Sequence, residues 1–222
     1  MSRGRFAGIL APHGKTPEPP DVPNFAWVEY GMRCGMPRIM RLLADRGIKA
    51  SAFINAQVAD VYPGMEAAQS VIQTSLQNAN PIIHPAVTLA NAARIEGTGG
   101  DFLFYEEGVT DSVGRLIEAV DRERIAIGAR LGVEIRPDPE MGMRQGYMLE
   151  ASYGSGYRMA PGFKGIGAQP QLDHRYLHEV VGYCLVFMSG LGAQIGVETP
   201  AIDSVIKMAS IVMARDYRAE AL

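Results

Sequence analysis

Residues 110–131, TDSVGRLIEAVDRERIAIGARL, carry the pattern that decides the fold class of this chain. Apolar side chains recur there every three or four residues, the spacing of one helical face. These residues are Val113, Leu116, Ile117, Val120, Ile127 and Leu131. Thr110 and Asp111 stand just before this face, and either could cap the helix N-terminus. The stretch therefore predicts a long amphipathic helix.

A second helix is predicted near the C-terminus. Thr199 is a capping residue type, and Pro200 suits the first helical position. The residues predicted to share one face of this helix are Val205, Met208, Ala209 and Val212. Residues 136–170 are rich in Gly, Pro, Met and Tyr and show no clear period. Together these patterns predict a mainly α domain over residues 62–222, a helical bundle.

The N-terminal part has a different pattern. Residues 1–24 include a proline-rich stretch and are predicted to form a tail or linker. Pro37 to Asp45 predicts a short helix, and the alternating pattern from Ile48 to Ile54 predicts a strand. Residues 25–61 are therefore predicted to be a partial α/β segment, a small appendage to the bundle.

Composition excludes several classes of partner. The 222 residues carry a formal net charge of -3 with no run of like charge, so nucleic acid is not expected as a partner. No stretch reaches the ~20 apolar residues of a membrane span, and the N-terminal apolar run is too short for a secretory signal. Two distant cysteines, Cys34 and Cys184, favour a reducing cytoplasm. We expect a cytoplasmic protein without a membrane partner.

Two glycine motifs resemble nucleotide-binding loops without matching them. In GILAPHGKT, residues 8–16, five residues separate Gly8 from Gly14 where a phosphate loop has four. In GLGAQIG, the spacing of Gly190, Gly192 and Gly196 is GxGxxxG rather than GxGxxG. Close helix packing or a helix end is the preferred role for this second motif.

His174 and His178 stand four residues apart and would project from one face of a helix. Such a pair could bind zinc with a third ligand, either Asp173 or Glu179. Two surface histidines are the favoured interpretation, because the sequence identifies no third ligand and no supporting shell. We therefore predict no metal site.

Asn80 and His84 form the strongest candidate for chemistry. They lie four residues apart, so a helix that starts at Pro81 would put His84 one turn from an Asn80 cap. A histidine between Ile83 and Pro85 is otherwise a hydrogen-bonded core residue. Arg175 offers a planar fork that can bind a carboxylate, with a surface ion pair to Glu179 as the alternative.

These clusters, in this order, resemble one family. Asn-Pro-x-x-His-Pro, Phe-Tyr-Glu-Glu-Gly-Val-Thr, Arg-Tyr-Leu-x-Glu and Gly-Ala-Gln-Ile-Gly-Val-Glu-Thr-Pro occur in succession between Tyr62 and Leu222. The stretch is similar to the C-terminal helical domain of octopine/nopaline-type opine dehydrogenases. Several motifs in the same order make the resemblance specific.

The resemblance implies a function and a site. The family joins an amino acid to a 2-keto acid as an imine and reduces it with NAD(P)H. By this resemblance, His84 is the catalytic acid/base, Asn80 is its neighbour in the substrate site, and Arg175 binds a substrate carboxylate. NAD or NADP is the implied cofactor. A histidine can exchange protons with the substrate, and a guanidinium can orient the keto acid for hydride transfer.

Two departures from the family are expected to impair this activity. Only 61 residues precede Tyr62, without GxGxxG, so we expect the chain alone to hold NAD(P)H poorly. In the family, an Asp that partners the catalytic histidine follows the Glu of Arg-Tyr-Leu-x-Glu, and in this chain Val180 occupies that position.

The N-terminal segment resembles a different family. Residues 24–33 and 42–62 are similar to polysaccharide deacetylase/allantoinase-like proteins, which predicts a fusion or fragment.

Two other functions remain open at this point. The bundle could be a non-catalytic helical module that forms a homodimer through apolar faces such as Val205, Met208 and Val212. The chain could also be the remnant of a metal-dependent deacetylase-like hydrolase, which would need a bound divalent ion.

Overall fold

A computed structural model describes residues 36–47 and 70–221 of this chain. The chain divides into two compact units, Met1–Val61 and Tyr62–Leu222, which we treat separately. The described part of the first unit is helix α2 (Met36–Asp45), which confirms the helix predicted there. Gly47 follows it with a left-handed φ of 63°, a conformation typical of a helix end. The predicted strand at residues 48–54 lies outside the described residues.

The second unit is helical, as the sequence predicts. Its elements in chain order are α4 (Val71–Leu76), α5 (Asn80–Ala90), α6 (Ala92–Thr98), α7 (Asp111–Arg130), α8 (Asp138–Gln145), α9 (Ser155–Arg158), the 3₁₀ helix η2 (Pro161–Phe163), α10 (Arg175–Glu179), the π-helix η3 (Val180–Leu185), α11 (Val186–Ile195), α12 (Pro200–Val212) and α13 (Tyr217–Glu220). Within residues 70–221 the β pairing is limited to one isolated antiparallel bridge, Leu103 with Gly167.

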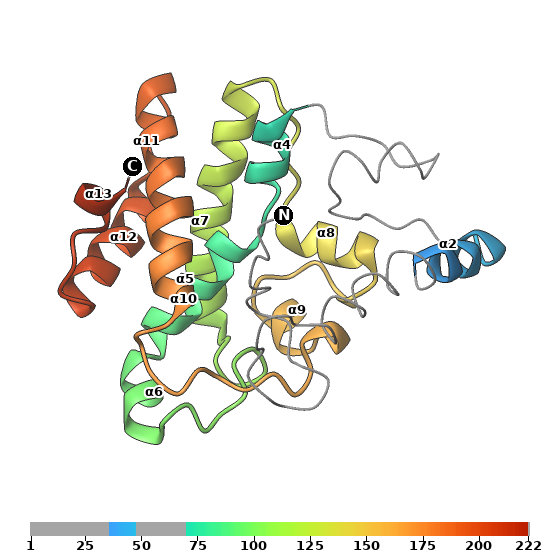
Figure 1. The fold of residues 1–222 in the computed structure, drawn as a ribbon, viewed down its shortest axis with the longest axis horizontal. Helices are drawn as coiled ribbons and strands as arrows, with labels where there is room; N and C mark the ends of the chain where they lie inside the picture. Colours follow the sequence, from blue (N-terminus) through green and yellow to red (C-terminus); the bar gives the residue numbers. More distant parts are fainter. Residues whose placement is uncertain (1–35, 48–69, 222) are drawn as a thin grey trace, which may run out of the picture. The chain divides into compact units, whose positions relative to one another are not determined.

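Helix α5 runs through the core of this unit. It packs against α7, α10, η3 and α12, and Figure 1 shows α7 beside α11 in the same bundle. Nearly every α5 side chain from Pro81 to Leu89 is buried. A helix enclosed on all sides is apolar all round, which explains why this segment lacks a clear amphipathic pattern.

Helix α7 confirms the prediction made from residues 110–131. Thr110 is its N-cap, and its hydroxyl accepts a hydrogen bond from the Val113 N–H at 3.3 Å. The side chains of the predicted face are buried or partly buried against the core: Val113, Leu116, Ile117, Val120, Ile127 and Leu131.

A buried ion pair also lies on α7. Asp121 and Arg124 are both 0% exposed, with a shortest contact of 2.5 Å. The Arg124 guanidinium also donates to the backbone carbonyls of Leu76 and Arg136. Through these hydrogen bonds, Arg124 connects α7 to the end of α4 and to the segment before α8. Sequence periodicity gave no sign of it.

Helix α12 departs from its prediction in two respects. Pro200 begins it and Thr199 precedes it, but the Thr199 side chain makes no capping hydrogen bond. The Glu123 carboxylate on α7 accepts from the N–H groups of Ala201 and Ile202, at 2.7 and 2.8 Å. A side chain 78 residues away thus satisfies donors that a local residue was expected to satisfy.

The buried face of α12 was also partly wrong. Val205 and Ala209 are buried as predicted, whereas Met208 and Val212 are 46% and 39% exposed. Ile202 and Ile206 complete the buried face. Apolar residues occur on two sides of this helix, so its period alone could not decide which side packs inward.

Two of the three glycines of GLGAQIG, Gly192 and Gly196, have the packing and terminating roles that we preferred, whereas a Cβ on Gly190 would meet open space. A Cβ on Gly192 would lie 2.9 Å from both Thr199 Cγ2 and the Val197 carbonyl oxygen, so the helix packs too closely there for a side chain. Gly196 ends α11 with a left-handed φ of 76°.

We expected no stretch of membrane-spanning length, and by length and composition alone that expectation was wrong, because Arg175–Ile195, which joins α10, η3 and α11, is long and apolar enough to cross a membrane. It is the one such helix within the described residues. Length and composition are weak grounds for a membrane span, because helices from the interior of globular proteins satisfy the same test. Leu177, Val181, Leu185 and Met188 of this stretch are buried in the core.

Candidate functional site

The start of α5 differs from the predicted arrangement. Ala79 occupies the N-cap position, and Asn80 is the first helical residue without a capping role. The Asn78 side-chain oxygen accepts a hydrogen bond from the Asn80 N–H at 3.1 Å, in place of the predicted Asn80 cap. Asn80 is exposed, and His84 follows one turn later on the same side of the helix.

The His84 imidazole lies among aromatic rings. Its Nε2 is 3.1 Å from the Tyr105 hydroxyl oxygen. The ring stacks on Tyr176, with centroids 3.9 Å apart and planes 12° from parallel. Phe104 approaches edge-on at 6.1 Å. The imidazole is thus held by both ring packing and one hydrogen bond.

His84 is uncharged at neutral pH. Burial is the main cause that lowers its pKa, to about 4, and the positive charges of Arg175 and His174 lower it further. The surroundings of the ring therefore favour its neutral form.

Arg175 is the first residue of α10, beside the Tyr176 that stacks on His84. Its guanidinium is 64% exposed and lies 3.1 Å from the Glu179 carboxylate. This is the surface ion pair that we considered as the alternative. The positive charge of the same guanidinium lowers the pKa of His84, which is 91 positions away in the sequence.

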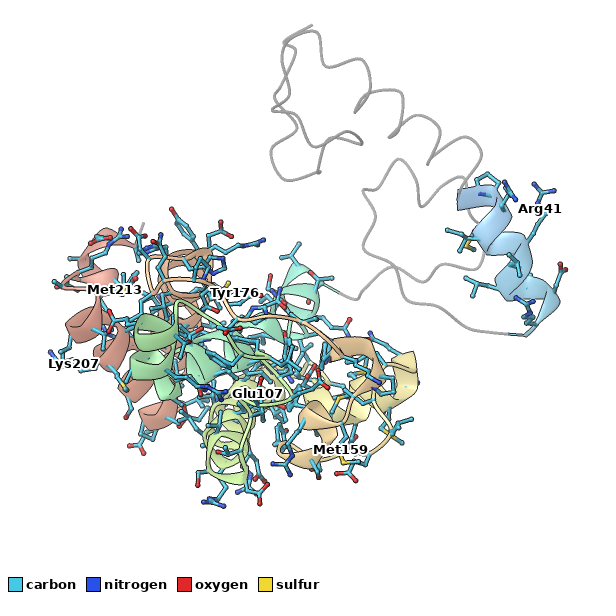
Figure 2. The ribbon with its side chains drawn as sticks, turned by 90° about the horizontal axis from the view of Figure 1, so that it is seen from below. Arg41, Glu107, Met159, Tyr176, Lys207 and Met213 are labelled. Atoms are coloured by element: carbon cyan, nitrogen blue, oxygen red, sulfur yellow. The ribbon has the colours of Figure 1, made fainter. Side chains whose placement is uncertain are left out.

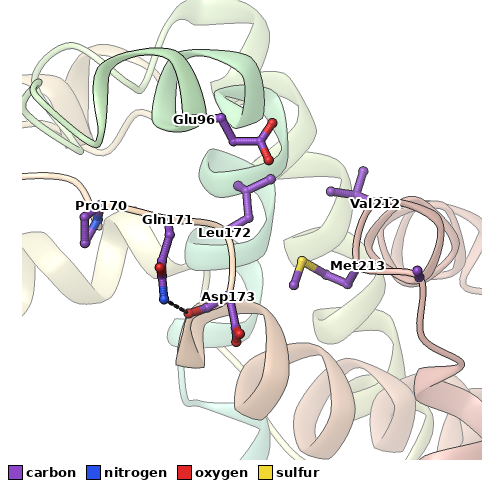
Figure 3. A pocket seen from close by; sticks show the side chains of 8 residues that line it. Glu96, Pro170, Gln171, Leu172, Asp173, Val212 and Met213 are labelled. Carbon is purple, nitrogen blue, oxygen red and sulfur yellow. Dashed lines mark hydrogen bonds between the residues drawn. The ribbon is translucent and has the colours of Figure 1, made fainter.

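Two surface hollows in the described part of the chain lie away from His84. One is formed by α6, the segment before α10 and the end of α12, with Glu96, Leu172, Asp173 and Met213 in its lining (Figure 3). Another is an apolar depression on α12. His84 lines neither of them. A common pocket for Asn80, His84 and Arg175 therefore stays a prediction.

His174 and His178 take part in hydrogen bonds within the protein. His174 is the N-cap of α10, and its Nδ1 accepts from the Tyr176 N–H at 3.4 Å. His178 Nε2 lies 2.6 Å from Asp173 Oδ1, and its Nδ1 contacts Arg215 and the Tyr217 hydroxyl. Across the described ranges, no group of three His, Cys, Asp or Glu residues could hold a metal ion.

Val180 follows α10 and begins the π-helix η3. It is 6% exposed. In the described part of the chain, no carboxylate makes a hydrogen bond to His84. The side-chain hydrogen-bond partner of His84 there is the Tyr105 hydroxyl. The Tyr105 contact is the feature of this site that sequence reasoning missed. Tyr105 stood inside the quoted Phe-Tyr-Glu-Glu-Gly motif, but nothing in the motif indicated that it would meet His84.

Solved structures define the class of this fold. The chain is similar to octopine dehydrogenase with NADH and L-arginine, at a TM-score of 0.58 and 16% identity, over 75% of this chain and 48% of that one. The same comparison with octopine dehydrogenase bound to NADH and agmatine gives a TM-score of 0.57 and 15% identity. The second unit therefore has the fold of the octopine dehydrogenase helical domain.

The family follows from sequence. Residues 67–213 match the NAD/NADP octopine/nopaline dehydrogenase alpha-helical domain, and this chain belongs to that family. The opine dehydrogenase of Arthrobacter sp. (strain 1C) is 38% identical over 169 residues, 74% of this chain and 45% of that protein. Protein ocs of Agrobacterium tumefaciens is 34% identical over 63% of this chain and 39% of its own length. The chain thus spans less than half the length of these relatives.

Proposed function

We propose that residues 62–222 are the substrate-binding domain of an opine dehydrogenase-type enzyme. The proposed reaction is the NAD(P)H-dependent reductive condensation of an amino acid with a 2-keto acid. One observation carries the proposal: the His84 imidazole stacks on Tyr176 at a centroid distance of 3.9 Å, and the residue just before Tyr176 in the chain is Arg175, whose guanidinium is exposed. A proton-exchanging group beside an anion-binding group suits a substrate that carries both a carbonyl and a carboxylate.

Arg175 is the proposed binder of the keto-acid carboxylate. Its present partner Glu179 is one helical turn away, and both side chains are more than half exposed. Such pairs contribute only about 0.3–0.5 kcal/mol, so a substrate carboxylate can replace Glu179 at little cost. The planar fork would then bind that carboxylate with two parallel hydrogen bonds.

His84 is the proposed acid/base, and Asn80 is proposed to contact the amino-acid substrate. A carboxylate bound at Arg175 offsets the positive charge that now lowers the His84 pKa. Substrate binding therefore raises the His84 pKa above about 4 and makes the imidazole a better proton acceptor. Asn80 lies one turn before His84, where its amide could bind the substrate amine or carboxylate.

The described residues do not fit the nicotinamide cofactor. A dinucleotide site needs a glycine-rich turn between a strand and a helix N-terminus. Gly190 and Gly192 lie inside α11 and Gly196 lies at its C-terminal end, where the helix dipole is negative. We therefore propose that this chain alone holds NAD(P)H poorly.

A domain graft tests the proposal. Residues 62–222 replace the helical domain of a characterised octopine dehydrogenase, whose own nucleotide-binding half is retained. NADH binding to the graft, measured by calorimetry, is the control for a competent nucleotide site. We expect NADH oxidation only when an amino acid such as L-arginine and a 2-keto acid such as pyruvate are both present. A graft that binds NADH but leaves it unoxidised would refute the proposed function.

Self-association is a second candidate, supported by the outer face of α12. Met208, Ile211 and Val212 are exposed there, and Lys207 extends outward beside them (Figure 2). Val205, which we had included in this face, is buried and cannot contribute. Analytical ultracentrifugation distinguishes a homodimer from a monomer. A dimer dispersed by Ile211→Glu would support a role for this face.

The third candidate, a deacetylase-like remnant, depends on residues outside the described part of the chain. Metal analysis of the purified chain tests it directly. A stoichiometric divalent ion would support this candidate over the opine dehydrogenase proposal.

A further inference from the structure

Tyr105 lies in the segment between α6 and α7, and neighbouring backbone contacts hold that segment in place. The Phe104 N–H donates to the Ile166 carbonyl at 2.8 Å, and the Ala168 N–H donates to the Phe102 carbonyl at 2.9 Å. These bonds flank the bridge between Leu103 and Gly167. The backbone immediately before Tyr105 is therefore fixed against a second segment.

The Tyr105 ring is itself fixed by packing. It is 5% exposed and stacks on Phe163, with centroids 4.2 Å apart and planes 11° from parallel. Phe104 meets it edge-on at 5.1 Å. These contacts leave rotation of the hydroxyl hydrogen as the main freedom of the side chain. Its oxygen lies 3.1 Å from His84 Nε2.

The direction of this hydrogen bond follows from the chemistry of the two groups. Burial is the main cause that raises the pKa of the Tyr105 hydroxyl above its usual range, so it stays protonated. A neutral imidazole has one nitrogen that donates and one that accepts. A phenol is a stronger donor than acceptor, so the more favourable arrangement has the Tyr105 O–H donating to Nε2. The ring proton of His84 then resides on Nδ1.

We propose that Tyr105 is a positioning residue for His84, whose hydroxyl donates to Nε2 and holds the imidazole in the Nδ1–H tautomer and in one orientation. Tyr176 stacks on the same ring and limits its tilt, while Tyr105 limits its rotation. The hydroxyl is uncharged, so it orients the ring without stabilising the imidazolium as a carboxylate would. This role in catalysis rests on the proposed function; the tautomer assignment does not.

The tautomer can be measured on the full chain without substrate or cofactor. The ¹⁵N shifts and ring-proton correlations of His84, recorded above pH 7, show which nitrogen carries the proton. We expect the Nδ1–H tautomer in the unaltered chain. Tyr105→Phe keeps the aromatic packing and removes only the hydroxyl, so the spectrum should change to a mixture of tautomers.

Tyr176→Phe is the matched control. It removes the hydroxyl of the ring that stacks on His84 while keeping the stacked geometry, and we expect it to leave the tautomer unchanged. Protonation of Nε2 in the unaltered chain, or a Tyr105→Phe spectrum identical to that of the unaltered chain, would overturn the proposal. An equal change in both variants would do the same.

The graft gives the catalytic readout. Loss of a neutral hydrogen bond worth about 1 kcal/mol predicts a kcat roughly 5-fold lower in Tyr105→Phe, with little change in KM for pyruvate. An unchanged kcat would overturn the positioning role. An inactive graft with a normal His84 tautomer would instead count against the proposed function, which keeps the two failures distinguishable.

Discussion

Arg124→Met should destabilise the second unit strongly. Arg124 and Asp121 are 0% exposed, and the guanidinium satisfies the Asp121 carboxylate and the carbonyls of Leu76 and Arg136. Methionine fills a similar volume but removes the guanidinium from these acceptors, of which the Asp121 carboxylate and the Arg136 carbonyl keep other donors. Removing one partner of a buried ion pair costs about 3–5 kcal/mol, because the other charge stays buried and uncompensated.

Thermal unfolding followed by circular dichroism measures this loss as a lower midpoint temperature. For a unit of this size, each kcal/mol of lost stability lowers the midpoint temperature by about 2–4 °C, so a fall of roughly 6–20 °C is expected. Arg122→Met is the control on the same helix. Arg122 pairs with Glu118 one turn away and is 75% exposed, so its loss should cost less than about 1 kcal/mol.

A double variant shows how much of the loss is electrostatic. Asp121→Leu with Arg124→Met removes both charges, but it also leaves the Asp138 N–H and the Tyr153 hydroxyl without the Asp121 oxygen they now contact at 2.9 and 2.6 Å. Only partial recovery is therefore expected. An Arg124→Met variant as stable as Arg122→Met would refute the account of this pair.

Three further predictions concern other parts of the unit. Gly192→Ala should cost about 1–3 kcal/mol, because its Cβ would lie 2.9 Å from Thr199 Cγ2, whereas Gly190→Ala meets open space and should stabilise α11 by about 0.5–1 kcal/mol; urea titrations compare them. The pKa of His84 in the folded chain, about 4, lies below the ordinary histidine value of 6.5, so the unfolded chain binds the proton more readily. Stability should fall by up to about 3 kcal/mol as pH drops from 6.5 to 4, and His84→Gln should flatten this slope. Val180→Asp, if its carboxylate reaches His84, should raise the His84 pKa by about one unit or more in an NMR titration and increase the activity of the graft; an unmoved titration would show that Val180 does not occupy the partner's place.

The elements that could be predicted from sequence were those with one apolar face and a local cap. Helix α7 has both, and its face and its Thr110 cap are as predicted. Helix α12 has apolar residues on two sides and receives its cap from Glu123 on α7, so neither its buried face nor its cap could be found from neighbouring residues. Tertiary contacts decided both features.

The candidate site shows the same division. Motif order identified the family and pointed to His84 and Arg175, but motif order carries no distances. The contact of His84 with Tyr105 depends on how the segment before α7 is held by residues more than 60 positions later. The depressed pKa of His84 likewise results from burial and from a charge on another helix. The cytoplasmic location and the deacetylase-like N-terminal segment stay predictions.

The central claim is that His84 and Arg175 form one substrate site, and an NMR titration of His84 with and without saturating pyruvate tests it most directly. The account predicts that pyruvate offsets the charge of Arg175 and raises the His84 pKa above about 4. Arg175→Met should abolish the rise, and Arg122→Met, which removes an exposed arginine from a comparable ion pair, should preserve it. A His84 titration that pyruvate leaves unchanged, or a rise that persists in Arg175→Met, would contradict the claim.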